Sequence, residues 1–159
     1  MKSIPLAVAA IVAGACAGYG GSGLQAGASE SEVRASMGAP ALEMRDPDGA
    51  RHLYFPRGPL GNHTFVADLA PDGALREVRQ VLGDETFNRI RAGMTGDEVL
   101  RMIGPPRETA RSANLGQTAW DYKYQDTWGY PSIFSVMVAD NGIVAGKTTR
   151  RIESRDRGR

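Results

Sequence analysis

A stretch of sequence near the N-terminus recurs about 66 residues later, and this internal repeat is the strongest constraint on the fold. Residues 27–40 align without a gap with residues 93–106, so that glycine, serine or threonine, glutamate, valine, glycine and proline coincide. Chance agreement at that many informative positions is improbable. Self-similarity at a fixed period indicates one supersecondary unit that is built more than once and stacked. The sequence therefore predicts two similar units in tandem.

Each copy carries the start and stop signals of a short helix. A serine or threonine followed three residues later by glutamate is a capping box, in which both side chains bond free backbone N–H groups of the first turn. A glycine then permits a left-handed C-terminal cap, and a proline prevents the helix from continuing. The paired signals are Ser29 and Thr95, Glu32 and Glu98, Gly38 and Gly104, and Pro40 and Pro106.

The remainder of each copy is patterned as strands joined by tight turns. Apolar residues alternate before Asp72–Gly73 in the first copy and before Asn141–Gly142 in the second, which are hairpin signals, and Asn-Gly favours a type I′ turn. An earlier strand is expected at 51–55 and at 119–125. In the second of these, Trp120, Tyr122 and Tyr124 alternate, as they would on one face of a sheet.

The expected fold class is α+β. Each unit is predicted to be a short helix plus a three-stranded antiparallel meander in two layers, and a further short helix capped by Asp84 links the units. The predicted organisation is a signal peptide at 1–15, a flexible tether at 16–26, a degenerate first repeat at 27–82, a second repeat at 83–150 and a basic tail at 151–159.

The N-terminal segment has the features of a secretory signal. Lys2 precedes an uncharged run from Ile4 to Ala13, which is too short to span a bilayer and gives way to a Gly/Ser-rich tether. Cys16 follows three small residues and is the only cysteine, so an intramolecular disulfide is impossible. A signal peptide whose cysteine merely falls near the cleavage site is one interpretation. The other is a lipobox, with Cys16 as the lipid attachment site.

Residues that carry chemistry are sparse. Lys and Arg total 19 against 18 Asp and Glu, so no strong positive field points to nucleic acid. His52 and His63 are the only histidines, and they are expected at the surface rather than as metal ligands or bases. No paired cysteines and no serine nucleophile motif accompany them. We therefore expect no enzyme activity, no metal, no cofactor and no small-molecule substrate.

Two aromatic residues stand in a predicted loop. Trp128 and Tyr130 flank Gly129 and precede a proline, and Arg150 and Arg151 follow in the basic C-terminal region. Exposed Trp, Tyr and Arg are typical of contact sites for proteins or membrane surfaces. The same rings could instead fold back over the hydrophobic layer. The sequence leaves both interpretations open.

The second repeat resembles a known family, the SmpA/OmlA domain, which defines the BamE lipoproteins of the outer-membrane β-barrel assembly machinery. The resemblance covers about 83–150, and residues 27–82 are a degenerate version with Ala39 in place of the first proline and no tryptophan. The motif residues are Gly93, Thr95, Glu98, Gly104, Pro106, Trp120 and Gly142.

The resemblance implies a lipoprotein domain that faces the periplasm and is anchored to the outer membrane, where it supports barrel assembly through protein and lipid contacts. Ala17 after the cysteine is similar to lipoproteins sent to the outer membrane. A tandem of such units also resembles secreted β-lactamase-inhibitor proteins. The alternative function is therefore a secreted or tethered inhibitor or regulator of a periplasmic enzyme.

Overall fold

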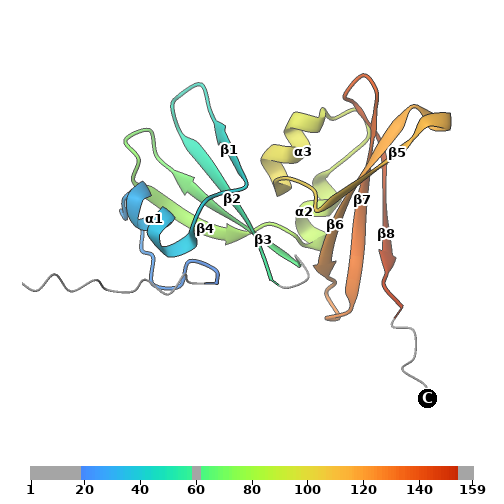
Figure 1. The fold of residues 1–159 in the computed structure, drawn as a ribbon. Helices are drawn as coiled ribbons and strands as arrows, with labels where there is room; N and C mark the ends of the chain where they lie inside the picture. The colour runs from blue at the N-terminus through green and yellow to red at the C-terminus, as the bar shows by residue number, and fades with distance from the viewer. Residues whose placement is uncertain (1–18, 59–61, 154–159) are drawn as a thin grey trace, which may run out of the picture.

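The computed structural model describes residues 19–58 and 62–153 (Figure 1). Cys16, the expected signal peptide and residues 154–159 of the expected tail lie outside these ranges. The described chain forms two four-stranded antiparallel sheets with a few short helices, which confirms the α+β class.

Both units contain a helix followed by four strands, and the second also has one more helix at its start and a 3₁₀ turn between its first two strands. The first contains α1 (Glu30–Met37), β1 (Leu42–Arg45), β2 (Arg51–Arg57), β3 (His63–Leu69) and β4 (Leu75–Gln80). The second contains α2 (Asp84–Arg89), α3 (Gly96–Ile103), β5 (Glu108–Ser112), a 3₁₀ turn (Ala113–Leu115), β6 (Gln117–Gln125), β7 (Pro131–Ala139) and β8 (Val144–Arg151). Each sheet is a simple meander whose strands pair in chain order.

The expectation of three strands per unit is wrong by one strand in each. The additional strands are β1 and β5, which pair with β2 and β6 along one side only. Edge strands are typically short and charged, and β5 is largely exposed, so it has little of the apolar alternation by which buried strands are recognised. Sequence patterning therefore detected the three strands around each hairpin turn and not the first strand of each sheet.

The predicted capping boxes are present in both units. The Ser29 hydroxyl accepts from the Glu32 N–H at 3.3 Å, and the Glu32 carboxylate accepts from the Ser29 N–H at 2.7 Å. The corresponding distances for Thr95 and Glu98 are 3.2 and 2.7 Å. Asp84, expected as a cap, is instead the first residue of α2, and its carboxylate bonds Tyr124 and Thr127.

The glycines that end these helices differ in one respect from the expectation. Gly38 and Gly104 have φ of 78° and 76°, but ψ is −160° and −166°, so the conformation is extended rather than a left-handed helical turn. This region of the backbone map is accessible essentially only to glycine. The position of glycine was thus predicted correctly and its geometry was not.

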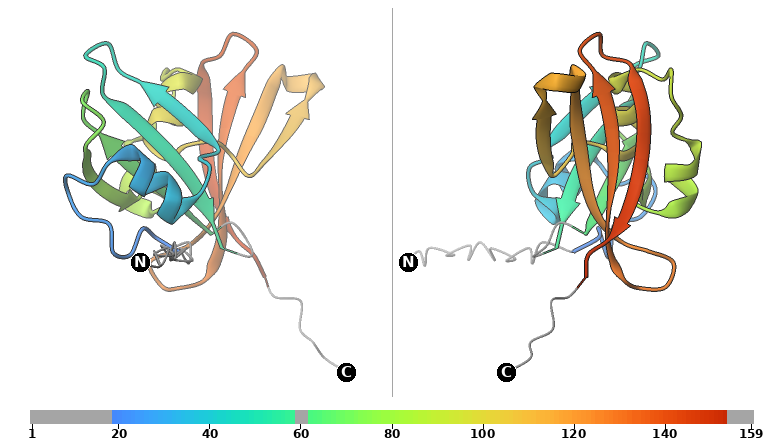
Figure 2. Two further views of the ribbon diagram at one scale, coloured as in Figure 1. Left: turned by 60° about the vertical axis from the view of Figure 1, so that its left-hand side comes forward. Right: turned by 90° about the vertical axis from the view of Figure 1, so that its right-hand side faces the viewer.

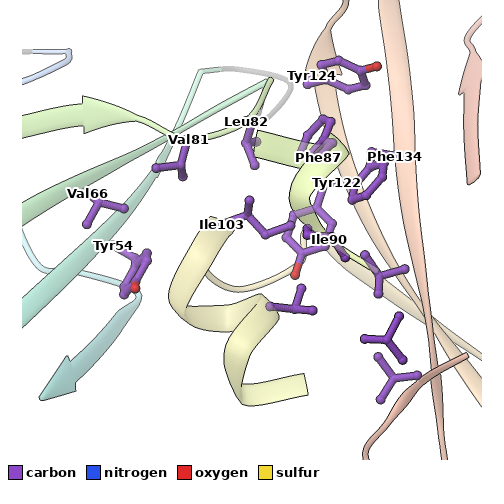
Figure 3. Packing of buried hydrophobic residues seen from close by; sticks show 14 residues of the cluster. Tyr54, Val66, Val81, Leu82, Phe87, Ile90, Ile103, Tyr122, Tyr124 and Phe134 are labelled. Atoms are coloured by element: carbon purple, nitrogen blue, oxygen red, sulfur yellow. The ribbon is translucent and has the colours of Figure 1, made fainter. Parts of the chain in front are cut away.

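Each unit has the expected two layers, a helical layer and a sheet, and the two units stack on each other (Figures 1 and 2). On one face of the first sheet, α1 packs against Leu53 and Phe55. The opposite face presents Tyr54 and Val66, which join the core formed by α2, α3 and the second sheet (Figure 3). Because strand β2 is apolar on both faces, it can be buried from both sides. The helix α3 therefore lies between the two sheets.

Candidate functional site

Three of the tight hairpin turns share one construction. In each, an Asp or Asn side chain accepts a hydrogen bond from the backbone N–H two residues further on, at 3.0 to 3.1 Å. The residues are Asp48, Asp72 and Asn141, and each precedes a glycine whose φ lies between 80° and 92°. No other residue type in the described ranges has positive φ, so Asn141–Gly142 is not the type I′ turn its sequence suggested. It is a three-residue loop in which the glycine forms a bulge.

The β6–β7 turn has the same backbone bonds but a different side chain at the key position. Gly129 N–H donates to Asp126 at 2.8 Å, and Asp126 N–H donates to Tyr130 at 3.0 Å. Trp128 stands where the other turns have Asp or Asn. Here the side chain that stabilises the turn is that of Asp126. Its carboxylate accepts from the N–H groups of Trp128 and Tyr130, both at 2.9 Å. The tryptophan ring is therefore not needed to form the turn.

The rings at this turn point into solvent. Trp128 is 78% exposed and Tyr130 is 55% exposed. The alternative in which they fold back over the hydrophobic layer is wrong for both. Trp, Tyr and Arg are the residue types most enriched among side chains that anchor protein interfaces. We call Trp128, Tyr130 and Arg151 the aromatic tip.

The aromatic tip is held in place by charged contacts. Arg151, the last residue of β8, contacts Asp126 at 2.8 Å and lies 4.6 Å from the centre of the Tyr130 ring, a cation–π distance. Thr127 anchors the loop to α2 through Asp84, with its hydroxyl 2.5 Å from the carboxylate. That bond and a weaker one from Tyr124 keep the pKa of Asp84 below its usual value. The turn is thus pre-organised before any partner binds.

The aromatic tip lies at the same end of the molecule as the start of the described chain. In Figures 1 and 2 the β6–β7 turn is at the bottom, together with the start of the described chain and the end of β8. The three turns built on Asp or Asn are at the top. We call the lower end the aromatic end. Tyr19 belongs to it through its hydroxyl, 2.7 Å from His63 Nδ1 at the start of β3.

The described part of the expected tether is packed on the first unit. Tyr19 contacts the rings of His63 and Phe65 edge-on, and Leu24 packs against the first core. A Cβ on Gly20 would lie 2.9 Å from the Phe65 ring, so the chain passes close to β3. Only two residues, Ala17 and Gly18, separate Cys16 from the docked Tyr19.

The remaining motif residues have structural roles. Trp120 is partly buried against the second core, beside the buried Tyr122 and Tyr124, as the alternation predicted. Gly93 N–H donates to Val144, and Gly142 closes its hairpin. Pro106 follows α3, and Arg150 is exposed on β8. The structure does not describe Cys16.

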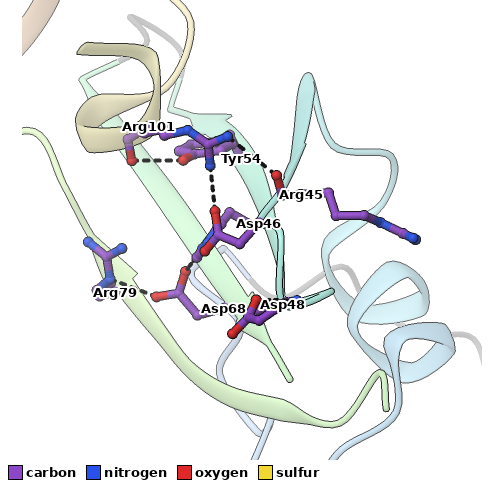
Figure 4. A network of polar contacts seen from close by, with 9 residues as sticks. Arg45, Asp46, Asp48, Tyr54, Asp68, Arg79 and Arg101 are labelled. Carbon is purple, nitrogen blue, oxygen red and sulfur yellow. Dashed lines mark hydrogen bonds and ion pairs between the residues drawn. The ribbon is translucent and has the colours of Figure 1, made fainter. Parts of the chain in front are cut away.

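A charged chain on the first sheet was not anticipated (Figure 4). His52 was expected at the surface, but its side chain is only 22% exposed, and its two ring nitrogens lie 2.5 Å from Asp68 and 2.9 Å from Asp46. Burial of the ring opposes protonation, but the bonds to the two carboxylates outweigh it and raise the pKa of His52. The sequence does not indicate this series of charged side chains, because its residues lie on different strands.

The chain of charges joins the two units. Asp46 also accepts from Arg101 of α3 at 2.6 Å, and Asp68 accepts from Arg79 at 2.8 Å. Nearby, the Tyr54 hydroxyl donates to the Arg101 carbonyl at 2.8 Å, and burial raises the pKa of Tyr54 to about 12. Each of these charged groups already bonds another member of the series, which indicates a structural role at the contact between the two units. We call this series the charged junction.

Residues 19–58 and 62–153 contain no cluster of three or more His, Cys, Asp or Glu side chains suited to hold a metal ion. The helices within those ranges are too short or too polar to cross a membrane.

Comparison with known proteins adds little. No protein-family model matches the chain, and no curated protein matches it. Among solved structures, a DUF4309 family protein, YjgB from Bacillus subtilis, is similar over 78% of both chains, with 13% sequence identity and a TM-score of 0.33.

Proposed function

We propose that this chain is a non-catalytic lipoprotein of the bacterial cell envelope, anchored to the outer membrane at Cys16, which acts through contacts made by its aromatic end. The observation that carries the proposal is Trp128. It occupies a turn position that Asp or Asn fills in three equivalent hairpins of the same molecule, and it is 78% exposed. The fold does not require a tryptophan at that position, and tryptophan is the residue type most enriched at the centre of protein contacts.

The short connection to Cys16 supports the same orientation. Three extended residues span at most about 11 Å, so an acylated Cys16 would hold Tyr19 close to the bilayer surface. The aromatic end would then face the membrane region and the opposite end the periplasm. Tyr130 and Arg151 suit this environment, because amphipathic rings and cations are favoured where apolar and aqueous phases meet.

The proposed partners are proteins that assemble outer-membrane barrels. The support is the resemblance of residues 83–150 to the SmpA/OmlA domain, of which the two units would be tandem, BamE-like copies. Both units contain a helix that starts with a capping box, α1 and α3, and in both the N-cap residue bridges to the residue just before the last strand, Ser29 to Ala74 and Thr95 to Ile143. The repeat thus extends beyond the matched sequence motifs.

Lipidation is tested by mass spectrometry of the mature N-terminus. We expect a chain that begins at acylated Cys16, with several acyl groups, because one chain alone anchors weakly. The variant Cys16→Ser should leave the membrane fraction. An unmodified thiol in the mature protein, or cleavage at another site, would contradict the proposal.

Contact through the aromatic tip is tested by capture of partners from solubilised envelopes. Trp128→Asn restores the residue type found in the equivalent turns, so the fold should be kept while capture of barrel-assembly subunits falls by about tenfold or more, as for a central interface tryptophan. Leu115→Ala is the matched control, because Leu115 is 69% exposed in the 3₁₀ turn before β6, and the next residue, Gly116, accepts a hydrogen bond from Asp140 in the β7–β8 turn. Equal loss of capture in both variants would contradict a contact through the tip.

A further inference from the structure

A cavity of about 330 Å³ lies between the two units and opens to solvent. Pro56 and Thr64 of the first sheet form one side, Pro106 and Tyr122 form the other, and Leu82 of the connecting segment lies between them. Thr64, Leu82 and Tyr122 are buried, and most of the wall is carbon. Figure 3 shows Leu82 and Tyr122 within the hydrophobic cluster that borders this space.

Two cations complete the lining. Arg107 precedes β5 and Lys123 lies on β6, and both border the cavity. Both cations form ion pairs with the same carboxylate, because Glu108 Oε1 is 3.5 Å from Arg107 Nε and 3.7 Å from Lys123 Nζ. Both distances exceed hydrogen-bond length, so the two cations can turn toward a bound anion. The three side chains together carry a net positive charge.

We propose that this cavity binds an anionic amphiphile with a single acyl chain, such as a medium-chain carboxylate. The chain would occupy the carbon-lined space, and the carboxylate would lie between Arg107 and Lys123. The volume is at the lower end of the ~300–1,000 Å³ of small-ligand sites, which fits one acyl chain better than the two of a phospholipid.

A peptide suits the cavity less well. Its backbone N–H and C=O groups would need hydrogen-bond partners, which a carbon-lined wall does not supply. An acyl chain brings no such groups, and its single charge matches the charge at the lining. This ligand site is separate from the aromatic tip and does not depend on acylation of Cys16.

The test uses the full chain carrying Cys16→Ser, so that it needs no detergent, and isothermal titration calorimetry with octanoate, decanoate and dodecanoate as monomers. We expect one site per chain, with affinity rising about fourfold for each added methylene until the cavity is full. Dodecylammonium should bind more weakly than dodecanoate. Affinity that does not depend on chain length, or a preference for the cationic amphiphile, would overturn the proposal.

Substitutions then place the site. Ala41→Phe adds a ring at the cavity lining and should lower dodecanoate affinity at least tenfold, whereas Ala110→Phe, on the exposed strand β5, should not. Lys123→Gln should weaken dodecanoate about fivefold and leave dodecanol unaffected, because only the charge contact is lost. Equal binding by the two phenylalanine variants would refute the location. A peptide that shifts the Leu82 methyl signals in NMR spectra where dodecanoate does not would refute the ligand class.

Discussion

His52 shows how much one residue can depend on its neighbours. Its ring lies between Asp46 and Asp68, which are themselves bonded to Arg101 and Arg79. The series alternates in sign when the ring is protonated, and it runs from β4 across the first sheet to α3. The protonated histidine therefore holds Asp46 in place on the first sheet, where the same carboxylate meets Arg101 of the other unit.

The raised pKa of His52 gives a signed prediction for stability against pH. Because the folded pKa lies above the ordinary value of 6.5, the contribution is fully present below about pH 6.5 and is lost as the pH rises through the folded pKa. Urea unfolding of the wild type should show this decline, and His52→Gln should remove it. His63→Gln, which leaves both carboxylates of the junction in place, should keep it. A wild-type stability that rises over this interval would contradict the assignment.

A Cβ atom added at Gly104 would probe how closely the two units pack. A Cβ there would lie 2.8 Å from Tyr54 Cδ1 and 3.2 Å from Thr64 Cγ2, both in the other unit. Gly38 has nearly the same backbone angles, with nothing within 4 Å of its Cβ position. We expect Gly38→Ala to cost about 1–3 kcal/mol from backbone strain alone. Gly104→Ala should cost about 1–3 kcal/mol more from overpacking, measured by urea unfolding. Equal costs would show that the units do not press together here.

At the scale of elements, the helices and hairpins were the most predictable parts. Capping boxes and Asp-Gly or Asn-Gly turns act within a few residues, so sequence alone located α1, α3 and two of the hairpins. The edge strand β5 was missed because a polar, exposed strand has weak periodicity, whereas β1 alternates clearly but is only four residues long. That the units pack against each other follows from the repeat, but the residues of the contact do not, because the apolar second face of β2 is visible only once its strand partners are known.

The same logic applies to the candidate site. Trp128 and Tyr130 could be predicted from residue type as candidate contact residues. Their exposure could not, because it depends on the turn geometry that Asp126 imposes. The charged chain around His52 has no sequence signature, since its members are separated along the chain and meet only through strand register.

The capping box at the start of α3 can be tested by substitution of Thr95, which is exposed. Thr95→Ala removes the bond from the Glu98 N–H to the threonine hydroxyl and should cost ~1 kcal/mol of unfolding free energy. Thermal or urea unfolding measures it. Thr95→Ser, which keeps a hydroxyl, should recover most of the loss. If serine were as damaging as alanine, the side chain would act through its methyl group and not through the cap.

At the scale of the whole molecule, the two ends differ in a way that the repeat does not explain. One end carries three polar turns, and the other carries the aromatic tip, Tyr19 and the short connection to Cys16 (Figure 2). Two nearly equivalent units would be expected to have similar ends. The asymmetry is what an anchored molecule needs if one end meets the membrane region and its partners while the other faces solvent.

Site-specific photo-crosslinking in intact envelopes tests this account most directly. A photoreactive phenylalanine analogue is placed at position 128 of the full-length chain, and in a second sample at position 141, the equivalent turn position at the opposite end. The account predicts crosslinks from position 128 to barrel-assembly proteins or lipid, and few from position 141. Crosslinks to envelope proteins from position 141 with none from position 128 would contradict it.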